Sequence, residues 1–315
     1  MNTQLIQAER KFWQGAIATV LRILAYYYPL YKGRGYLCQF KLFCWTLSGQ
    51  GSIWTYLKKE GLWLLVPLDD FNGRLLYYFG GYIDIKWVCK RILRPADNVI
   101  DIGANLGFVT HISRQIVGTQ GQVHAFEPQS QLVDLMRQSL ERNGYTDVVI
   151  HNIALGKNKE QQPFFIPIHH CGGASLIASS GYGPKTRTIS VPVENAGTYL
   201  SKLGLSHIRL MKMDVEGYEA EIIEGALDFL KVTPPDTILF EIMACYHNIP
   251  FCQQPVVKLL SQLDYQFLNI TKVYFKMRLQ PIESTSHSMQ YGNDILAVRN
   301  GKTYNEIAKL VGAIS

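Results

Sequence analysis

A glycine-spaced loop near residue 100 has the residue types of a nucleotide-binding turn. Residues 101–108 read DIGANLGF and follow a short apolar run, the usual setting for a strand that turns into a helix. Gly103 permits a tight turn, and Gly107 lets a helix begin close to the strand. This spacing fits several nucleotides, but Asp101 would repel a pyrophosphate and could accept a hydrogen bond from the ammonium of a methionine moiety. The loop therefore favours S-adenosylmethionine, and an NAD-dependent oxidoreductase is the alternative.

Two further segments fit the same nucleotide. The residues FEP at 126–128 close the next apolar run about 20 residues later, where an acid can accept both ribose hydroxyls. This acid indicates a ribose without choosing between the two cofactors. The residues NIAL at 152–155 end the third run, a position that lies beside the adenine in this topology. The residues predicted to bind the cofactor are Asp101, Gly103, Asn105, Gly107, Phe108, Phe126, Glu127, Pro128, Asn152, Ile153, Ala154 and Asp214.

Acidic side chains follow the next two apolar runs. Asp214 and Glu216 share one face of an extended segment, so both could reach the transferred methyl group or its acceptor. Glu241 ends the fifth run, and His247 lies just beyond it. A hydroxyl acceptor must lose its proton, and carboxylates and imidazole can take it. Asp214, Glu216, Glu241 and His247 are therefore the catalytic candidates. No clear second Asp or Asn ligand accompanies Asp214, so we expect no metal.

Alternating strand and helix patterns must position these segments. The predicted strands are 99–102, 122–126, 148–154, 208–213 and 237–242, and the predicted helices are 106–117, 129–143, 218–230 and 255–263. An irregular block at 156–197 interrupts the alternation with two extended pieces, 163–168 and 188–193. At the end, strands at 266–270 and 295–299 have no helix between them. This order predicts an α/β class I methyltransferase (Rossmann-like) fold, with a seven-stranded sheet that ends in an antiparallel hairpin.

The motifs of this region, taken together, resemble the FkbM family of S-adenosylmethionine-dependent methyltransferases. The resemblance covers residues 97–299 and is carried by VIDIGANLGFVT, HAFEP, VVIHNIALG, LMKMDVEGYEAEIIEGA, LFEI and GNDILAV. It implies O-methylation of a hydroxyl on a small molecule, sugar, polyketide or peptide natural product, with a carboxylate as the other acceptor. Members often carry Thr-Leu-Asp before the fourth strand, where this chain has Asn195-Ala196-Gly197. We therefore expect acceptor recognition to differ here.

The chain before residue 98 is predicted to add two segments to the methyltransferase domain at 98–315. Residues 1–60 are expected to form a helical N-terminal extension, and residues 61–97 an entry hairpin and helix. The predicted hairpin pairs 62–68 with 74–79 across the turn DDFNG, and a helix follows at 83–93.

The N-terminal extension contains an amphipathic helix. Trp13, Ile17, Val20, Leu24 and Tyr28 fall on one helical face, opposite several charged or polar residues. We expect this apolar face to pack on the domain or on a second subunit in a homodimer; docking on a membrane surface is the alternative. Gln14 and Arg22 interrupt the apolar run, which argues against a spanning helix.

Charge and cysteine content set the remaining expectations. Residues 1–97 hold 13 Lys and Arg against 6 Asp and Glu, and the rest of the chain is nearly neutral. An RNA methyltransferase could use this basic third for binding, although no RNA-binding module is recognisable. The six cysteines form no Cys-x-x-Cys pair, which favours a reducing cytoplasmic location. A non-catalytic scaffold is disfavoured because the acids at the predicted sheet edge are intact.

Overall fold

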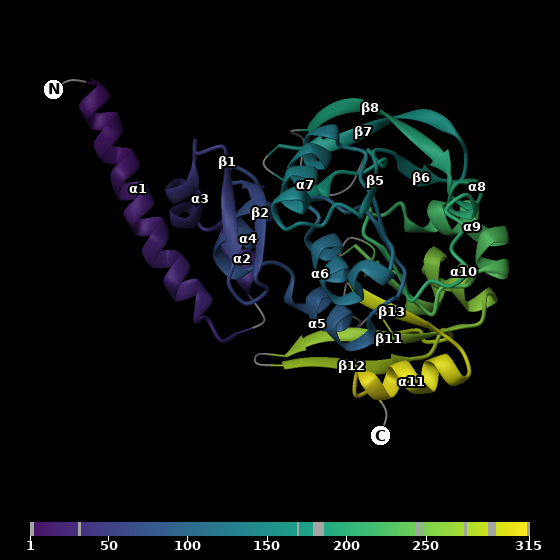
Figure 1. The fold of residues 1–315 in the computed structure, drawn as a ribbon. Coiled ribbons are helices and arrows are strands. Elements are labelled where there is room, and N and C mark those ends of the chain that lie inside the picture. The colour runs from purple at the N-terminus through teal and green to yellow at the C-terminus, as the bar shows by residue number, and fades with distance from the viewer. Residues whose placement is uncertain are drawn as a thin grey trace.

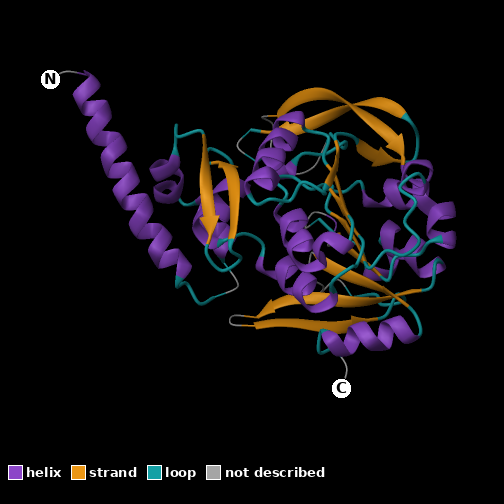
Figure 2. Cartoon of the chain, in the orientation of Figure 1, coloured by secondary structure: helices purple, strands orange, loops and turns teal. Residues whose placement is uncertain are grey.

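The computed structural model describes residues 3–30, 33–168, 170–178, 186–243, 246, 248–273, 276–288 and 294–313. A central sheet runs through the body of the molecule, with helices on both of its faces and a smaller sheet at one end (Figure 1). The long N-terminal helix lies at the opposite edge, beyond a separate two-stranded hairpin (Figure 2).

The central sheet has the order β12-β11-β13-β10-β9-β3-β4-β5. Its strands are β3 (Val99–Ile102), β4 (Val123–Phe126), β5 (Val149–His151), β9 (Leu210–Met213), β10 (Thr237–Glu241), β11 (Tyr265–Val273), β12 (Lys276–Ile282) and β13 (Asp294–Arg299). Strands β5, β4, β3, β9 and β10 are parallel, and β13 lies antiparallel between β10 and β11. This order confirms the predicted class I methyltransferase fold and its antiparallel end.

One strand was not predicted. β12 pairs with β11 as an edge hairpin, so the sheet has eight strands rather than seven. Only Met277 and Leu279 of β12 are buried, in alternation with exposed polar residues. Two apolar positions are too few to mark a strand in the sequence.

Alternate residues of the central strands bury against two helical layers. Val99 of β3 belongs to the core beneath α5 (Ile83–Ile92), α6 (Phe108–Val117) and α11 (Lys302–Leu310). Ile100 and Ile102 face the other core, beneath α8 (Ala196–Ser201), α9 (Glu219–Val232) and α10 (Pro255–Gln262). The strands are therefore buried on both faces, as parallel strands require. Helix α7 (Ser130–Arg142) packs beside β4 and the N-terminal hairpin.

The irregular block forms the smaller sheet, in the order β6-β8-β7. Its strands are β6 (Ala154–Gly156), β7 (Glu160–Pro167) and β8 (Thr186–Asn195), and β8 pairs antiparallel with β7 along eight residues. The two extended pieces expected in this block are therefore strands. They stand beside the edge of the central sheet where the glycine loop lies.

The N-terminal segment differs from the prediction in two places. Its elements are α1 (Thr3–Tyr26), α2 (Arg34–Gln39), α3 (Lys41–Leu47), β1 (Ser52–Leu57), β2 (Leu62–Pro67) and α4 (Phe71–Phe79). The hairpin pairs β1 with β2, so residues 1–60 are not entirely helical. Residues 74–79 belong to helix α4 rather than to a strand. Asp70 caps this helix, because its Oδ1 accepts the N–H groups of Asn72 and Gly73 at 2.8 and 3.4 Å.

Helix α1 is also oriented differently from the prediction. The predicted packing of this apolar face on the domain is wrong, because Trp13, Val20 and Leu24 are exposed, and packing on a second subunit stays a prediction. The helix packs on the chain through Gln14, Ala18 and Ala25, and Gln14 Nε2 donates to the carbonyl of Trp45 at 2.7 Å. Small residues and one hydrogen-bonded amide allow α1 to approach α3 and α4 closely. Among the described residues, no helix is long and apolar enough to cross a membrane.

Candidate functional site

A pocket opens at the carboxyl ends of the parallel strands. Ligands of open α/β sheets bind at this edge because the loops that leave the strands diverge there. Nine of the twelve predicted cofactor residues line the pocket: Gly103, Asn105, Phe108, Phe126, Glu127, Pro128, Ile153, Ala154 and Asp214. Asp101, Gly107 and Asn152 do not. Of the predicted catalytic residues, Asp214, Glu216 and Glu241 line it, and His247 lies outside the described residues.

The glycine loop is bound closely to its neighbours. Gly103 has φ +74°, and a Cβ there would lie 2.0 Å from the carbonyl oxygen of Asp214. Gly107 has φ +75°, and a Cβ there would lie 2.6 Å from Cγ of Met136. Both positions therefore need glycine for conformation and for space. Gly107 shapes the loop without lining the pocket, and its expected contact with the cofactor stays a prediction.

Asp101 holds the loop instead of facing the pocket. Its carboxylate is fully buried, with Oδ2 accepting from Thr110 Oγ1 at 2.6 Å and Oδ1 lying 3.3 Å from Lys212 Nζ. Asp101 does not line the pocket, and its expected hydrogen bond to a methionine ammonium stays a prediction. The acid at the head of the loop serves to anchor it.

Lys212 connects the two central strands of the site. Its ammonium donates to the carbonyl of Gly103 at 2.7 Å and lies 3.3 and 3.4 Å from the carboxylates of Asp101 and Asp214. Burial disfavours the charged amine, but the two carboxylates outweigh it and raise the pKa of Lys212 above its usual range. A single buried cation therefore fixes the glycine loop against the end of β9.

The carboxylate of Glu127 is oriented so that it can accept hydrogen bonds from hydroxyl groups of a ligand in the pocket. The backbone N–H groups of Asn105 and Gln129 donate to its two carboxylate oxygens, each at 2.9 Å. Each oxygen keeps a further lone pair, so two vicinal hydroxyls can bind side by side. Burial raises the pKa of Glu127 to about 7, against the opposing effect of these N–H donors. This geometry supports the predicted role of Glu127 at a ribose.

Strand β6 and the residue before it contribute an apolar wall to the pocket. Ile153, Ala154 and Leu155 line the pocket on the side of β6. Asn152 is exposed, and its Nδ2 donates to the carbonyls of Glu127 and Pro128 at 2.9 and 3.1 Å. Its amide therefore holds the loop that carries Glu127, and the expected contact of Asn152 with the cofactor stays a prediction.

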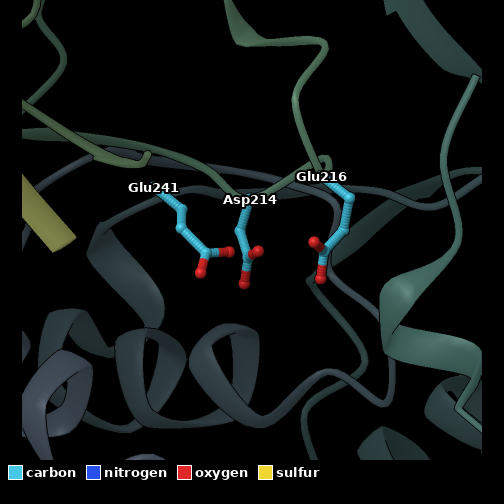
Figure 3. A group of neighbouring side chains, drawn as sticks. All are labelled: Asp214, Glu216 and Glu241. Atoms are coloured by element: carbon cyan, nitrogen blue, oxygen red, sulfur yellow. The ribbon is translucent and has the colours of Figure 1, made fainter. Parts of the chain in front are cut away.

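Three carboxyl groups meet at the far end of the pocket. The side chains of Asp214, Glu216 and Glu241 point in the same direction, with one oxygen from each within 4.8 Å of the others (Figure 3). Burial, followed by repulsion from Asp214 and Glu216, raises the pKa of Glu241 well above its usual range. Such a cluster favours a cation beside it and can hold a proton. Carboxylates at this spacing could also ligate a metal ion, so the expected absence of a metal stays a prediction.

Residues beyond the predicted cofactor-binding and catalytic sets close the pocket. Asn72, Tyr82, His170 and Cys171 line it from α4, α5 and the loop after β7. Tyr82 Oη donates to Asn72 Oδ1 at 2.6 Å. Asp70 Oδ2 accepts the N–H of Cys171 at 2.5 Å, so the carboxylate that caps α4 also holds this loop.

Local signals for two of these residues exist. An Asp two positions before Asn72 is a typical helix cap, and Gly81, before Tyr82, packs so tightly on Phe108 that a Cβ would lie 2.8 Å from its ring. The loop at 170–173 carries no comparable signal.

The strand order and the pocket define a class I methyltransferase. The chain belongs to the FkbM methyltransferase family, because the family's domain profile, "Methyltransferase FkbM domain", matches residues 101–267, more than half of the chain. This membership confirms the resemblance, the predicted class of enzyme and its cofactor, S-adenosylmethionine. It leaves the NAD-dependent alternative without support.

Two relatives match parts of the chain. Protein-L-isoaspartate O-methyltransferase of Aeropyrum pernix is 30% identical over 76 residues, which is 24% of this chain and 28% of that protein. Methyltransferase 1 of Beauveria bassiana is 23% identical over 152 residues, which is 42% of this chain and 60% of that protein. The chain thus spans less than two thirds of either relative's length.

Solved structures overlap the fold loosely. Precorrin-6y C5,15-methyltransferase from Geobacter metallireducens has a TM-score of 0.39 and 12% identity, over 69% of this chain and 87% of that one. The O-methyltransferase TomG from Streptomyces achromogenes has a TM-score of 0.38 and 13% identity, over 69% and 79%. The fold class rests on the strand order, not on these structures.

The pocket fits S-adenosylmethionine on three physical grounds. The glycine loop lines the pocket at Gly103, Ala104 and Asn105. Glu127 offers carboxylate oxygens for the ribose, and Ile153 and Ala154 offer apolar surface for the adenine. The three clustered carboxyl groups provide negative charge for a positively charged sulfur.

Replacement of Lys212 by Met should destabilise the fold. The variant leaves Asp101 fully buried without its counter-charge, so we expect the free energy of unfolding to fall by about 3–5 kcal/mol. Urea unfolding followed by circular dichroism measures the change. The control K231M removes an exposed lysine paired with Asp228 and should cost less than about 1 kcal/mol. Equal losses in both variants would refute the role of Lys212.

Cofactor affinity should weaken below neutral pH. Ribose hydroxyls donate to the ionised form of Glu127, so binding lowers a pKa that lies at about 7 in the free protein. The dissociation constant for S-adenosylmethionine should be constant above pH 7.5 and rise roughly tenfold per pH unit below 7. Isothermal titration calorimetry at several pH values measures this.

A matched pair of variants isolates Glu127 from other groups. E127Q should weaken binding about 10- to 100-fold at pH 8 and remove the pH dependence. Burial also raises the pKa of Glu219 to about 7, but this residue does not line the pocket. E219Q should therefore keep the pH dependence. If E219Q alone lost the pH dependence of binding, the titrating acid would be Glu219 and not Glu127.

Proposed function

We propose that the protein is an S-adenosylmethionine-dependent O-methyltransferase that acts on a hydroxyl of a small molecule, sugar or natural product. The observation that supports this proposal is the convergence of three carboxyl groups beside the predicted cofactor cradle, in one pocket. A hydroxyl is a weak nucleophile until a base takes its proton. This pocket contains candidate bases where the acceptor must lie.

The chain contributes position and a proton acceptor to such a reaction. When bound, S-adenosylmethionine supplies a methyl group already activated by the positive charge on its sulfur. The glycine loop, Glu127 and the apolar wall hold the donor in place, and the segments around Asn72 and Cys171 restrict access of water. The remaining requirements of the reaction are to align the acceptor oxygen with the methyl group and to remove its proton.

Glu241 is the base that we propose. Its carboxyl group is buried beside Asp214 and Glu216, and their charges together with burial raise its pKa. A positive charge placed among these carboxylates favours ionised Glu241, because opposite charges attract more strongly in a buried site. Glu241 therefore ionises when the donor is present and can accept the hydroxyl proton. Asp214, paired with Lys212, is fixed as a charged neighbour.

The proposed acceptor site lies between the smaller sheet and α4. Phe164 of β7, Leu176, His170 and Phe71 line this side of the pocket, and the His170 ring stacks on Phe71 with centroids 4.7 Å apart. Aromatic and apolar walls with few polar groups suit a compact organic acceptor. A carboxylate is the second candidate, because the relative from Aeropyrum pernix is named for O-methylation of protein L-isoaspartate.

Isolation of the methylated product tests the proposal. The protein is incubated with S-adenosylmethionine labelled in its methyl group and with an extract of its native host. We expect label in a small molecule that survives mild alkali, since methyl ethers are stable and methyl esters release methanol. Label removed by ribonuclease would instead favour an RNA methyltransferase. A parallel reaction with EDTA should be unchanged; activity lost with EDTA and restored by Mg²⁺ would show that a metal is required.

Glu241→Gln should abolish turnover and weaken donor binding only modestly. Loss of a general base costs roughly 10²- to 10⁴-fold in kcat, whereas loss of the negative charge that the donor's sulfur favours should raise the dissociation constant for S-adenosylmethionine by no more than about tenfold. The parallel variants D214N and E216Q distinguish the three acids. A kcat that falls further in E216Q than in E241Q would identify Glu216 as the base. Equal, small losses in all three variants would mean that none of these acids is the base and that the enzyme acts by aligning its substrates.

A further inference from the structure

Between Phe12 and Tyr27, the residue after α1, the solvent-facing side of this segment is apolar. Six large side chains on this side are exposed: Phe12, Trp13, Val20, Ile23, Leu24 and Tyr27, with exposed fractions of 69, 59, 56, 54, 63 and 75%. At about 100° per residue these six positions fall within an arc of about 120°, opposite the side that packs on α3 and α4. The helix stands at the edge of the molecule, away from the active-site sheet (Figure 1). A surface of this kind on a folded protein indicates an interaction.

A basic cleft adjoins one flank of this apolar face. Thr19, Arg22, Ile23, Tyr26 and Tyr27 of the α1 segment form one wall, and the β1–β2 turn with α4 and α5 forms the other, around about 660 Å³. Ile23 and Tyr27 belong both to the apolar face and to the cleft. Basic side chains line this cleft and the adjoining groove beside Trp87: Arg22, Arg34, Lys58, Lys59, Lys86, Lys90 and Arg91.

Acidic residues are scarce among those that line the cleft. Among the residues that line it, Glu60 is the single acid, and Lys86 already pairs with Glu60 at 2.5 Å. Burial, and then repulsion from Arg34 and Lys86, lower the pKa of Lys59. Lys59 Nζ lies 4.8 Å from the centre of the Tyr26 ring. The cleft therefore offers charge and hydrogen-bond donors to an anion, with aromatic rings at its mouth.

We propose that α1 and this basic cleft dock the enzyme on an anionic lipid surface. Helices that lie in the membrane interface combine an apolar face rich in Trp, Phe and Leu with basic residues beside it. Trp and Tyr favour the headgroup level because they carry a polar tip on an apolar ring. Phosphate headgroups fit the cleft, and the acyl region covers the face of α1.

Charge selects the lipid surface over a second copy of the chain. A dimer formed through α1 would bring two basic clefts close together, and that contact would repel. An anionic surface instead attracts the basic residues, and each Lys or Arg near it raises the partition coefficient of the protein onto the membrane about fivefold. Docking also places the membrane near the active site, because Leu76 of α4 lines both the cleft and the catalytic pocket.

Vesicle co-sedimentation of the full chain tests this proposal without any methyl transfer, so its outcome is independent of the proposed reaction. The vesicles are phosphatidylcholine alone or with 30% phosphatidylglycerol, which is about the anionic fraction that gives a negative surface potential. We expect sedimentation with the anionic vesicles that declines as salt rises, and little with the neutral ones.

Paired variants separate the two parts of the surface. W13Q/L24Q should reduce the partition coefficient about tenfold or more, and K58A/K59A about 25-fold. The matched controls V232Q, at an apolar residue 82% exposed on α9, and K302A/K309A, at exposed lysines of α11, should change it less than about twofold. Unchanged binding of S-adenosylmethionine verifies that each variant is folded.

Three results would overturn the proposal. The first is no sedimentation with anionic vesicles. The second is a wild-type dimer in light scattering that W13Q/L24Q dissociates, since a second copy would then cover the apolar face. The third is inorganic phosphate bound in the cleft, detected by titration and lost in K58A/K59A, without any vesicle binding; the cleft would then serve a free phosphate compound.

Discussion

The buried ammonium of Lys212 is the contact on which the active site depends. It touches the glycine loop through the carbonyl of Gly103 and two acids through their carboxylates, one at the end of β3 and one at the end of β9. Taking these charges from water is costly, and only their close pairing offsets that cost. The position of the loop is thereby coupled to the position of Asp214.

Two further acids of the pocket have raised pKa values. Burial raises the pKa of both Glu127 and Glu241, and repulsion from Asp214 and Glu216 adds to the effect at Glu241. Hydroxyl donors beside Glu127, or a cation beside the cluster of Asp214, Glu216 and Glu241, would favour the ionised forms of these acids. A ligand that supplies such groups stabilises the protein through its binding.

Sequence reasoning succeeded where one segment contains its own evidence. The glycine loop, Glu127 and the acids after β9 and β10 were recognised because residue type and strand end lie together. The burial of Asp101 beside Lys212 was not predicted, because Lys212 lies 111 residues away and no local pattern shows which way a carboxylate points. Helix α4 was taken for a strand because Asp70 was counted as a turn residue rather than a cap. Periodicity identified the apolar face of α1 but could not show that it faces solvent.

The position of α4 connects the two ends of the molecule. Asp70 caps it and also fixes Cys171 in the loop over the pocket, while Leu76 separates the pocket from the basic cleft. A ligand that orders the cleft therefore acts on a helix that already shapes the acceptor side of the active site. An acceptor carried at a lipid surface would meet both sites at once, which is a physical reason for one chain to combine an exposed apolar helix with a closed, acidic pocket.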